Sequence, residues 1–255
     1  WQYVARATDQ IERMPIPRGK VTGGSSAINA QICLRGEPGD YDSWASLGND
    51  RWSFDQLLPY FRKLETDTDF RNDIHGADGP IKVRRFKEPE WLEDQKAFYK
   101  ACRSAGYPDC PDHNDPDSTG VGPTPFNNPD GIRWSTAIGY LAQARTRLNL
   151  TIRPDCLVHR VLFEGKTAVG LEVESGGEVY AVHGEEIVLS AGAIGSPHIL
   201  MLSGVGPADQ LEGQGVSIVH ELPGVGENLR DHPQAHLTWK ARDDFQQDDL
   251  VPHLQ

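Results

Sequence analysis

The chain has 255 residues, enough to bury a hydrophobic core in one large domain or two small ones. Its 37 acidic side chains outnumber its 25 Lys and Arg residues, and the formal net charge of −12 argues against nucleic acid as a partner. Hydrophobic residues make up 38% of the chain without a run long enough to cross a bilayer, so we expect no membrane span.

Helical and strand patterns organise the first half of the chain. They predict an extended lead-in over residues 1–18, a short helix over 39–48 and a longer helix over 54–64. An exposed acidic loop over 65–78, a strand over 81–86 and an amphipathic helix over 90–105 are expected to follow. Pro59 lies inside the longer helix and should kink it or move its start. Its apolar face is expected to be core.

The second half is richer in strands. We expect an irregular segment over residues 108–129 and a helix over 135–141. We expect three strands over 157–163, 168–174 and 178–182, and a fourth, buried strand over 186–190. Short turns between the first three strands imply an antiparallel meander. The fourth strand runs straight into Ala191 and Gly192, as in the βα unit of a doubly wound sheet. The acidic residues 243–249 are expected to be poorly ordered.

Neither metals nor disulfides are expected. The acidic group around residues 112–117 lacks the spacing, the central glycine and the closing glutamate of a calcium loop. Cys102, Cys110 and His113 lack a paired C-x-x-C and an evident fourth ligand, so we predict no metal site. The irregular spacing of the four cysteines favours free thiols and a cytoplasmic location.

Two glycine-containing runs carry the chemistry. The first, residues 19–36, reads GKVTGGSSAINAQICLRG, and its paired glycines allow a planar or phosphorylated ligand to come close to the backbone. Ser25 and Ser26 could cap a short helix over residues 27–34, whose N-terminus would suit an anion. A glycine-rich surface turn is the alternative.

The second run, residues 192–206, reads GAIGSPHILMLSGVG. With both runs in this order, the chain resembles the glucose–methanol–choline (GMC) family of flavin oxidoreductases and is choline dehydrogenase-like. The second run fits the family signature throughout. The first departs from it at Thr22, where an aliphatic residue is usual, and at Cys33, where an aromatic one is common.

The resemblance implies an α/β fold: an FAD/NAD(P)-binding doubly wound sheet with an inserted antiparallel β-meander and part of an α+β substrate domain. It divides the chain into a first FAD-binding segment over residues 1–52 and a cap and substrate-domain segment over 53–149. A second FAD-binding segment with the meander covers 150–235, and residues 236–255 are the start of a substrate domain or a disordered tail. The family's opening G-x-G-x-x-G loop and its C-terminal catalytic histidine have no counterpart here, which predicts a fragment of a longer enzyme.

The resemblance also implies a set of FAD-binding residues. The family's loop along the flavin matches Val21, Gly23, Gly24 and Ser25, and its turn beside the isoalloxazine ring matches Asn29, Ala30, Gln31 and Ile32. The backbone that meets the adenine matches Val158, and the small turn beside the adenosine matches Ala191 and Gly192. Val158 has the alternative of a plain strand residue. Some family members attach FAD through a histidine where this chain has Ala27, so we expect non-covalent FAD.

By resemblance, the expected function is an FAD-dependent alcohol dehydrogenase or oxidase acting on a small-molecule alcohol. In such a reaction a base takes the alcohol proton while hydride passes to the flavin. We assign no catalytic residue in this chain; the candidate base that we considered is His232. The alternatives are a hydroxynitrile lyase with the same fold and a non-catalytic flavoprotein remnant or assembly partner. The sequence leaves the oligomeric state open.

Overall fold

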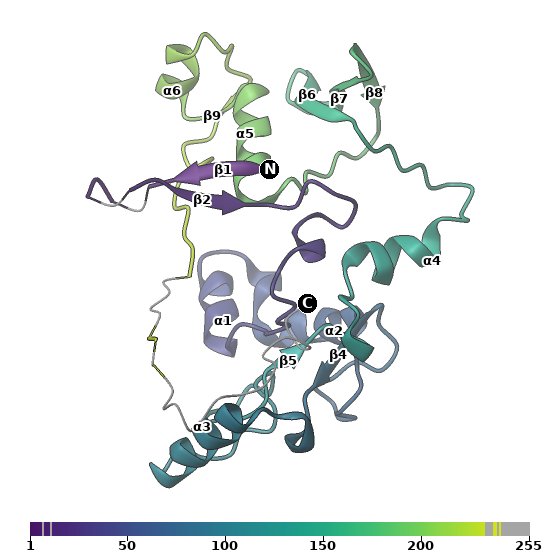
Figure 1. Cartoon of the computed structure of the whole chain (residues 1–255). Helices are drawn as coiled ribbons and strands as arrows, with labels where there is room; N and C mark the ends of the chain where they lie inside the picture. The colour runs from purple at the N-terminus through teal and green to yellow at the C-terminus, as the bar shows by residue number, and fades with distance from the viewer. Residues whose placement is uncertain (7, 11, 233–236, 239, 241–255) are drawn as a thin grey trace. The chain divides into compact units, whose positions relative to one another are not determined.

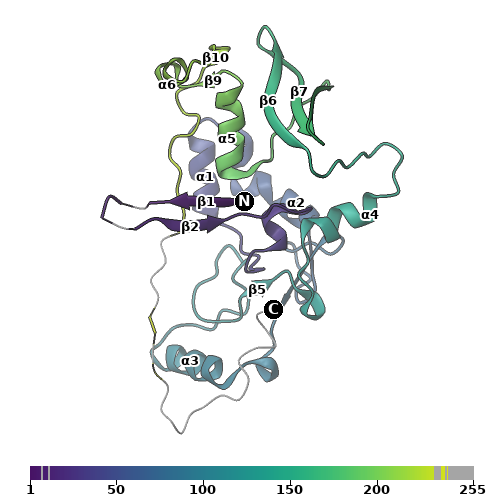
Figure 2. The same cartoon turned by 45° about the horizontal axis from the view of Figure 1, so that its top comes forward.

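The computed structural model of the chain describes residues 1–6, 8–10, 12–232, 237, 238 and 240 (Figures 1 and 2). The predicted acidic tail over residues 243–249 lies outside this range. The chain divides into two compact units, the first containing Trp1–Leu150 and the second Thr151–Lys240. No helix of the described residues has both the length and the apolar character needed to cross a membrane.

The first unit contains these elements: β1 (Gln2–Ala5), β2 (Met14–Pro17), the 3₁₀ helix η1 (Gly24–Ala27), α1 (Pro38–Ser46), η2 (Asp50–Trp52), α2 (Phe54–Leu64), β3 (Glu65–Asp67), β4 (Ile81–Arg85), η3 (Glu88–Glu90), α3 (Glu93–Ser104), β5 (Pro125–Phe126), η4 (Pro129–Gly131), the π-helical turn η5 (Ala137–Leu141) and α4 (Ala142–Ala144). The helices predicted over residues 39–48, 54–64 and 90–105 are confirmed as α1, α2 and α3. α2 continues past Pro59. The lead-in is not merely extended, because β1 and β2 pair as an antiparallel hairpin.

The first unit contains a three-stranded sheet with the order β3-β4-β5. β3 runs parallel to β4, while β5 runs antiparallel to it. Ile81 and Val83 on β4 belong to the core, together with Phe54 at the start of α2. Tyr41 of α1 packs its ring 6.2 Å from that of Phe54, which joins α1 to α2.

The prediction of an exposed acidic loop over residues 65–78 is wrong for the start of this segment, which is a buried strand. Its first three residues form β3, and the side chain of Asp67 is fully buried. Glu65 is 3% exposed. The expectation failed because carboxylates can be buried when cations are buried beside them, and the chain supplies those cations from distant segments.

The second unit contains β6 (Leu157–Glu164), β7 (Thr167–Ser175), β8 (Glu178–His183), α5 (Gly192–Leu202), β9 (Val205–Gly206), α6 (Ala208–Gly213) and β10 (His220–Glu221). β6, β7 and β8 form an antiparallel sheet in that order, which confirms the meander. α5 packs on β6, and the N–H of Val161 donates to Oγ of Ser203 at 2.8 Å. β9 and β10 form a short parallel pair.

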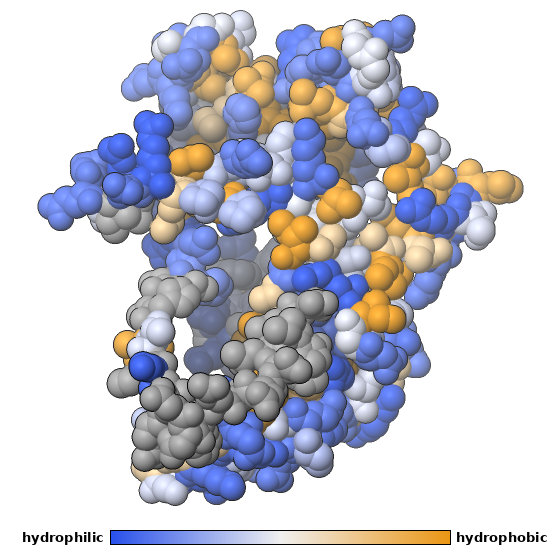
Figure 3. Space-filling view, in the orientation of Figure 1, coloured by the Kyte–Doolittle hydropathy of each residue, from blue (hydrophilic) through white to orange (hydrophobic). Residues whose placement is uncertain are grey.

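The strand expected over residues 186–190 is not formed. No described strand pairs with this segment, and Val188 is 73% exposed. An apolar run becomes a buried strand only where neighbouring strands take up its backbone hydrogen bonds. Ile187 and Leu189 line a largely apolar hollow of about 460 Å³ between the meander and α5, where apolar side chains are visible in Figure 3.

Candidate functional site

The run from Gly19 to Gly36 is a loop with a single helical turn. The helix predicted over residues 27–34 is absent, and η1 occupies Gly24–Ala27 instead. Neither Ser25 nor Ser26 caps η1 through its side chain. Gln31 has a positive φ of 65°, a left-handed conformation that stops a helix. Four residues are too few for the anion site that the sequence suggested.

The glycines of this loop have distinct roles. A Cβ on Gly19 would lie 2.2 Å from the carbonyl oxygen of Gly24, so two parts of the loop cross where only glycine fits. Gly23 has φ of 97° and packs against Ala137. Gly24 has φ of 56°, and a Cβ there would have no heavy atom within 4 Å. The loop therefore presents open space at Gly24.

Residues 133–137 hold this loop from one side. Ser26 donates its hydroxyl to the carbonyl oxygen of Gly23 at 2.6 Å and accepts the N–H of Thr136 at 3.0 Å. The guanidinium of Arg133 donates to the backbone carbonyl of Asn29 and to its Oδ1, the latter at 3.2 Å. Oδ1 of Asn29 also accepts the N–H of Gln31 at 3.1 Å. Its amide oxygen is therefore engaged, and its amide nitrogen is the group left to meet a ligand.

The turn Asn29–Ile32 combines exposed residues with one buried amide. Asn29, Ala30 and Ile32 are exposed, whereas Gln31 is 6% exposed. Among the described residues, Oε1 of Gln31 is a buried acceptor without a hydrogen-bond partner. A buried acceptor of this kind is costly unless something donates to it. FAD, which the resemblance implies, carries N–H groups on its rings, so the residues present fit it.

The other members of the predicted loop set are Val21 and Ser25, both exposed. Ser25 accepts the N–H of Gly19 at Oγ, at 3.1 Å. The structure therefore brings the eight predicted flavin residues of the first unit together on one loop. The remaining three lie in the second unit.

In the second unit, Val158 lies on β6, which is an edge strand of its sheet. Its pairing with Val173 is followed directly by a register shift. Ala191 and Gly192 form the start of α5, where the N–H of Ala191 donates to Oγ of Ser196 at 3.0 Å. Gly192 has φ of 83° and open space where a Cβ would lie. Both places leave backbone accessible to a ligand.

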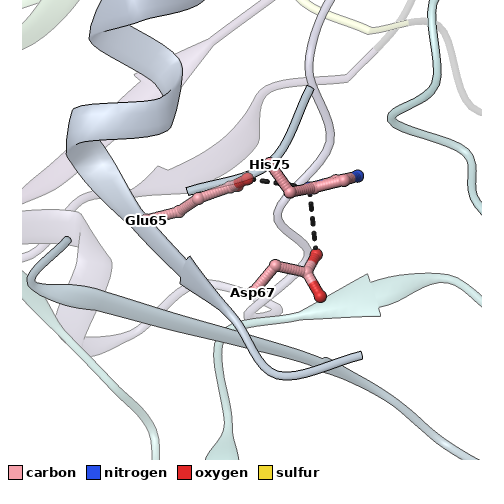
Figure 4. A group of neighbouring side chains, drawn as sticks. All are labelled: Glu65, Asp67 and His75. Carbon is pink, nitrogen blue, oxygen red and sulfur yellow. Dashed lines mark hydrogen bonds and ion pairs between the residues drawn. The ribbon is translucent and has the colours of Figure 1, made fainter. Parts of the chain in front are cut away.

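Sequence reasoning missed a buried ionic cluster in the first unit. We define the ionic cluster as Arg35, Glu65, Asp67, His75, Arg85 and Asp112. His75 lies at its centre: Nδ1 is 2.8 Å from Oε1 of Glu65 and 3.2 Å from Oδ2 of Asp67. Figure 4 marks both contacts with dashed lines. Its Nε2 is 2.7 Å from Oδ2 of Asp112. The His75 side chain is fully buried.

Two arginines complete the ionic cluster. Arg85 donates to Asp67 at 2.8 Å and to Asp112 at 2.6 Å. Arg35 donates to Oε1 of Glu65 at 2.6 Å. Three cationic groups thus meet three carboxylates in space that water does not reach, an arrangement that holds only when every charge has a partner.

This environment shifts two pKa values in opposite directions. Burial by itself lowers the pKa of His75, but its hydrogen bonds to Asp112 and Glu65 outweigh burial and raise the pKa to about 9. Burial raises the pKa of Asp112, but the hydrogen bonds from His75 and the backbone of Asn114, with the charge of Arg85, lower it to about 2. His75 is therefore a cation at neutral pH.

The ionic cluster could be mistaken for a metal centre. Ligand-type atoms of Glu65, Asp67 and His75 lie within 4.8 Å of one another, the arrangement drawn in Figure 4. However, both ring nitrogens of His75 face carboxylates, and a protonated imidazole has no lone pair for a metal. Arg35 and Arg85 already neutralise the carboxylates. The arrangement therefore serves as an ion-pair network.

Cys110 and His113, where we predicted no metal site, form a plain contact. Sγ of Cys110 lies 3.4 Å from Nδ1 of His113. Within the described part of the chain, the three residues considered earlier do not form a group that could share an ion. Nearby, residues 34–39 and 113–119 line a polar cavity of about 790 Å³. None of the predicted flavin residues lines it.

Comparisons with known proteins identify the family. Residues 5–234 match the family model described as GMC oxidoreductase. The chain is 42% identical to an uncharacterized GMC-type oxidoreductase of Rhodococcus erythropolis, covering 94% of this chain and 48% of the relative. It is 40% identical to an oxygen-dependent choline dehydrogenase of Photobacterium profundum, covering 94% of this chain and 43% of that protein. The chain thus spans about half the length of the curated relatives it matches.

Solved structures agree with this assignment. The fold matches pyridoxine 4-oxidase from Mesorbium loti with a TM-score of 0.83 and 36% identity, over 88% of this chain and 44% of that one. It matches an FAD-dependent oxidoreductase from Chaetomium thermophilum with a TM-score of 0.78 and 32% identity, over 84% and 39%. The mixed α/β structure is therefore that of the FAD-binding α/β fold. The chain belongs to the GMC oxidoreductase family, whose members are FAD-binding oxidoreductases.

Proposed function

We propose that the protein carrying this chain is an FAD-dependent oxidoreductase that oxidises the CH–OH group of a small-molecule alcohol. The loop from Gly19 to Ile32 carries the proposal. It is fixed by hydrogen bonds from residues 133–137, presents open space at Gly24 and holds a buried acceptor in Gln31 that lacks a partner. A loop fixed in this way, with open space at one glycine and a few polar groups, suits a flat ring.

Bound FAD would supply the hydride acceptor for alcohol oxidation. The chain's own residues would hold and orient it. Gly23 and Gly24 would keep side chains away from the ring, the amide nitrogen of Asn29 would donate to its edge, and Oε1 of Gln31 would accept a hydrogen bond. We further propose that the backbone of Val158 meets the adenine and that Ala191 and Gly192 adjoin the adenosine.

Attachment of the cofactor is proposed to be non-covalent. Ala27 occupies the position at which some family members carry the linking histidine, and its methyl group cannot form such a bond. We assign no base in the chain. His232, the candidate considered for the base, is exposed, and its backbone N–H donates to Oδ1 of Asp231.

The substrate is proposed only as an alcohol. The names of the relatives include choline dehydrogenase, pyridoxine 4-oxidase and aryl-alcohol oxidase, which share an alcohol-type reaction and differ in substrate. We propose that residues 1–52 and 150–235 serve the cofactor and that residues 53–149 serve the cap and substrate side. A cytoplasmic location is also proposed.

The test is to purify the complete gene product and measure its flavin content, then assay a panel of alcohols with oxygen or a dye as electron acceptor. We expect one FAD per protein and flavin that bleaches on anaerobic addition of the preferred alcohol. A protein without flavin, or flavin that no alcohol reduces, would contradict the proposal. Cleavage of a cyanohydrin without flavin reduction would indicate a lyase instead.

A further inference from the structure

The ionic cluster lies directly against the segment that follows the predicted flavin turn. The guanidinium of Arg35 donates to Glu65 at 2.6 Å and to the carbonyl oxygen of Ile74 at 3.1 Å. Arg35 is only three residues beyond Ile32, the end of that turn. The position of the turn therefore depends on where the ionic cluster holds Arg35.

A second connection runs through Asn114. Asp112 of the ionic cluster accepts the backbone N–H of Asn114 at 3.0 Å. The side chain of Asn114 then accepts the N–H of Arg35 at 2.9 Å and donates to the carbonyl oxygen of Cys33 at 2.9 Å. Asn114 is 4% exposed, so water does not compete for these bonds. The side-chain amide of Asn114 thus fixes two backbone groups, at Cys33 and Arg35, in the segment that follows the predicted flavin turn.

The charge of the ionic cluster balances only when His75 is protonated. Arg35, Arg85 and His75 then offset Glu65, Asp67 and Asp112. Further charges lie at one edge, where Asp69 is 2.5 Å from Lys87 and 3.7 Å from Arg85. Loss of the proton from His75 would leave a buried carboxylate without its cation, which is costly in a space closed to water.

The surroundings of His75 also fix its geometry. Its ring stacks on that of Phe70 with centroids 5.5 Å apart, and the guanidinium of Arg85 lies 4.6 Å from the centre of the same ring. Asp67 is held in turn by the N–H groups of Asp69 and Phe70. His75 has therefore little freedom to find other partners when its charge changes.

We propose that the ionic cluster positions the flavin loop, which we define as residues 19–36, and that protonated His75 keeps residues 31–35 in the place that lets Asn29 and Gln31 meet the cofactor. The proposal rests on the proposed function. His75 and Asp112 are positioning residues in it, because neither belongs to the turn that would touch the flavin. The proposal predicts that retention of FAD depends on the protonation of His75, although His75 is distant in the sequence from the turn Asn29–Ile32.

The first experiment uses the unaltered holoenzyme. The rate of FAD dissociation is measured by free-flavin fluorescence from about pH 7 to about pH 9.5, below the ionisation of the flavin itself. We expect the rate to rise on the order of ten-fold, with a midpoint near the His75 pKa of about 9. The protection factors of the amides of residues 31–35, that is, their exchange slowing relative to the intrinsic rate at each pH, should fall over the same range.

The second experiment compares His75→Gln with a matched control, His159→Gln. His159 makes an exposed ion pair of 3.0 Å with Glu174 on the meander, so its loss removes a similar contact without a buried charge. We expect His75→Gln to release FAD rapidly already at pH 7 and to lose the pH step, while His159→Gln behaves as the parent does. Where His75→Gln does not fold, the pH profile of the unaltered protein decides.

The outcomes separate the two proposals. A protein that never contains FAD contradicts the proposed function, while the exchange measurement still reports on residues 31–35. An FAD-containing protein with a flat dissociation profile and constant protection factors at residues 31–35 contradicts the positioning proposal alone. So does a folded His75→Gln variant that retains FAD and its pH step as the parent does.

Discussion

The guanidinium of Arg133 reaches across 104 residues to donate to the backbone carbonyl and the Oδ1 of Asn29. This contact turns the carboxamide of Asn29 so that its oxygen faces the protein. A single donor thereby fixes both the backbone and the side chain of the residue proposed to meet the flavin edge.

Arg133→Met should loosen Asn29 while preserving most of the side-chain volume. A hydrogen bond from a charged donor is worth about 1.5–3 kcal/mol, so we expect FAD affinity to fall by about ten-fold or more. Titration of apoprotein with FAD measures it. Arg160→Met is the control, since Arg160 makes an exposed bidentate pair with Glu172 on the meander. Equal losses in the two variants would mean that Asn29 is not at the flavin.

Gly24→Val should remove FAD, because the branched side chain would fill the open space at this position. The matched control is Gly165→Val, at a turn residue with φ of 60°, close to the 56° of Gly24, and equally open surroundings. Both variants should lose about 1–2 kcal/mol of stability through left-handed strain. Only Gly24→Val should be colourless after purification, and retention of normal flavin stoichiometry would place the cofactor elsewhere.

Acid precipitation of the holoenzyme should release all FAD into the supernatant, because Ala27 offers no atom for a covalent bond to the cofactor. Absorbance of the supernatant and of the redissolved pellet measures the distribution. Flavin that stays with the pellet would reveal an attachment residue elsewhere.

The ionic cluster predicts how stability depends on pH. The pKa of His75 is raised from 6.5 to about 9, so its stabilisation is complete below pH 6.5 and is lost as the pH rises through about 9. The amount is on the order of 3 kcal/mol. The pKa of Asp112 is lowered from 3.8 to about 2, so its stabilisation is present above pH 3.8 and is lost as the pH falls through about 2.

Chemical unfolding of the parent and of His75→Gln across this range measures the difference. The two curves should diverge most between about pH 4 and pH 6.5 and converge above about pH 9. Because the His75–Asp112 contact contributes to both shifts, the two amounts are not additive. Parallel curves at all pH values would contradict the assignment of the charge to His75.

Cys33 should be unreactive in the folded protein. Burial, and after it the charge of Glu65, raises the pKa of its thiol to about 11, which leaves about one thiolate in a thousand at pH 8. Alkylation followed by peptide mapping should label Cys33 far more slowly in the native than in the urea-unfolded protein. Similar rates would show that residues 31–35 open readily.

Local sequence signals predicted the meander and the main helices well. Gly165 and the pair Gly176–Gly177 lie at the turns of the meander with positive φ, the conformation for which glycine is favoured. The helix over residues 27–34 failed because Gln31 takes a left-handed conformation that only the tertiary contacts of the loop explain. The strand over residues 186–190 failed because strand formation depends on neighbours.

The ionic cluster could not be predicted from residues taken alone. Asp67 and Asp112 lie in acidic stretches that are typical of solvated loops, and their partners are distant in the chain. One signal was available. In β4, Ile81, Val83 and Arg85 alternate on one buried face, so the strand period placed a cation in the core and required buried acids nearby.

The contacts that hold the flavin loop set an order of events during synthesis. Its partners Asn114, Arg133 and Thr136 lie 79, 104 and 110 residues beyond the loop residues they bind. At about 5–20 residues per second, these partners follow the loop by roughly 5–20 seconds, and long-range contacts of this kind form late. The flavin loop can therefore reach its folded conformation only after most of the first unit has been synthesised, so FAD binds late in the maturation of the protein.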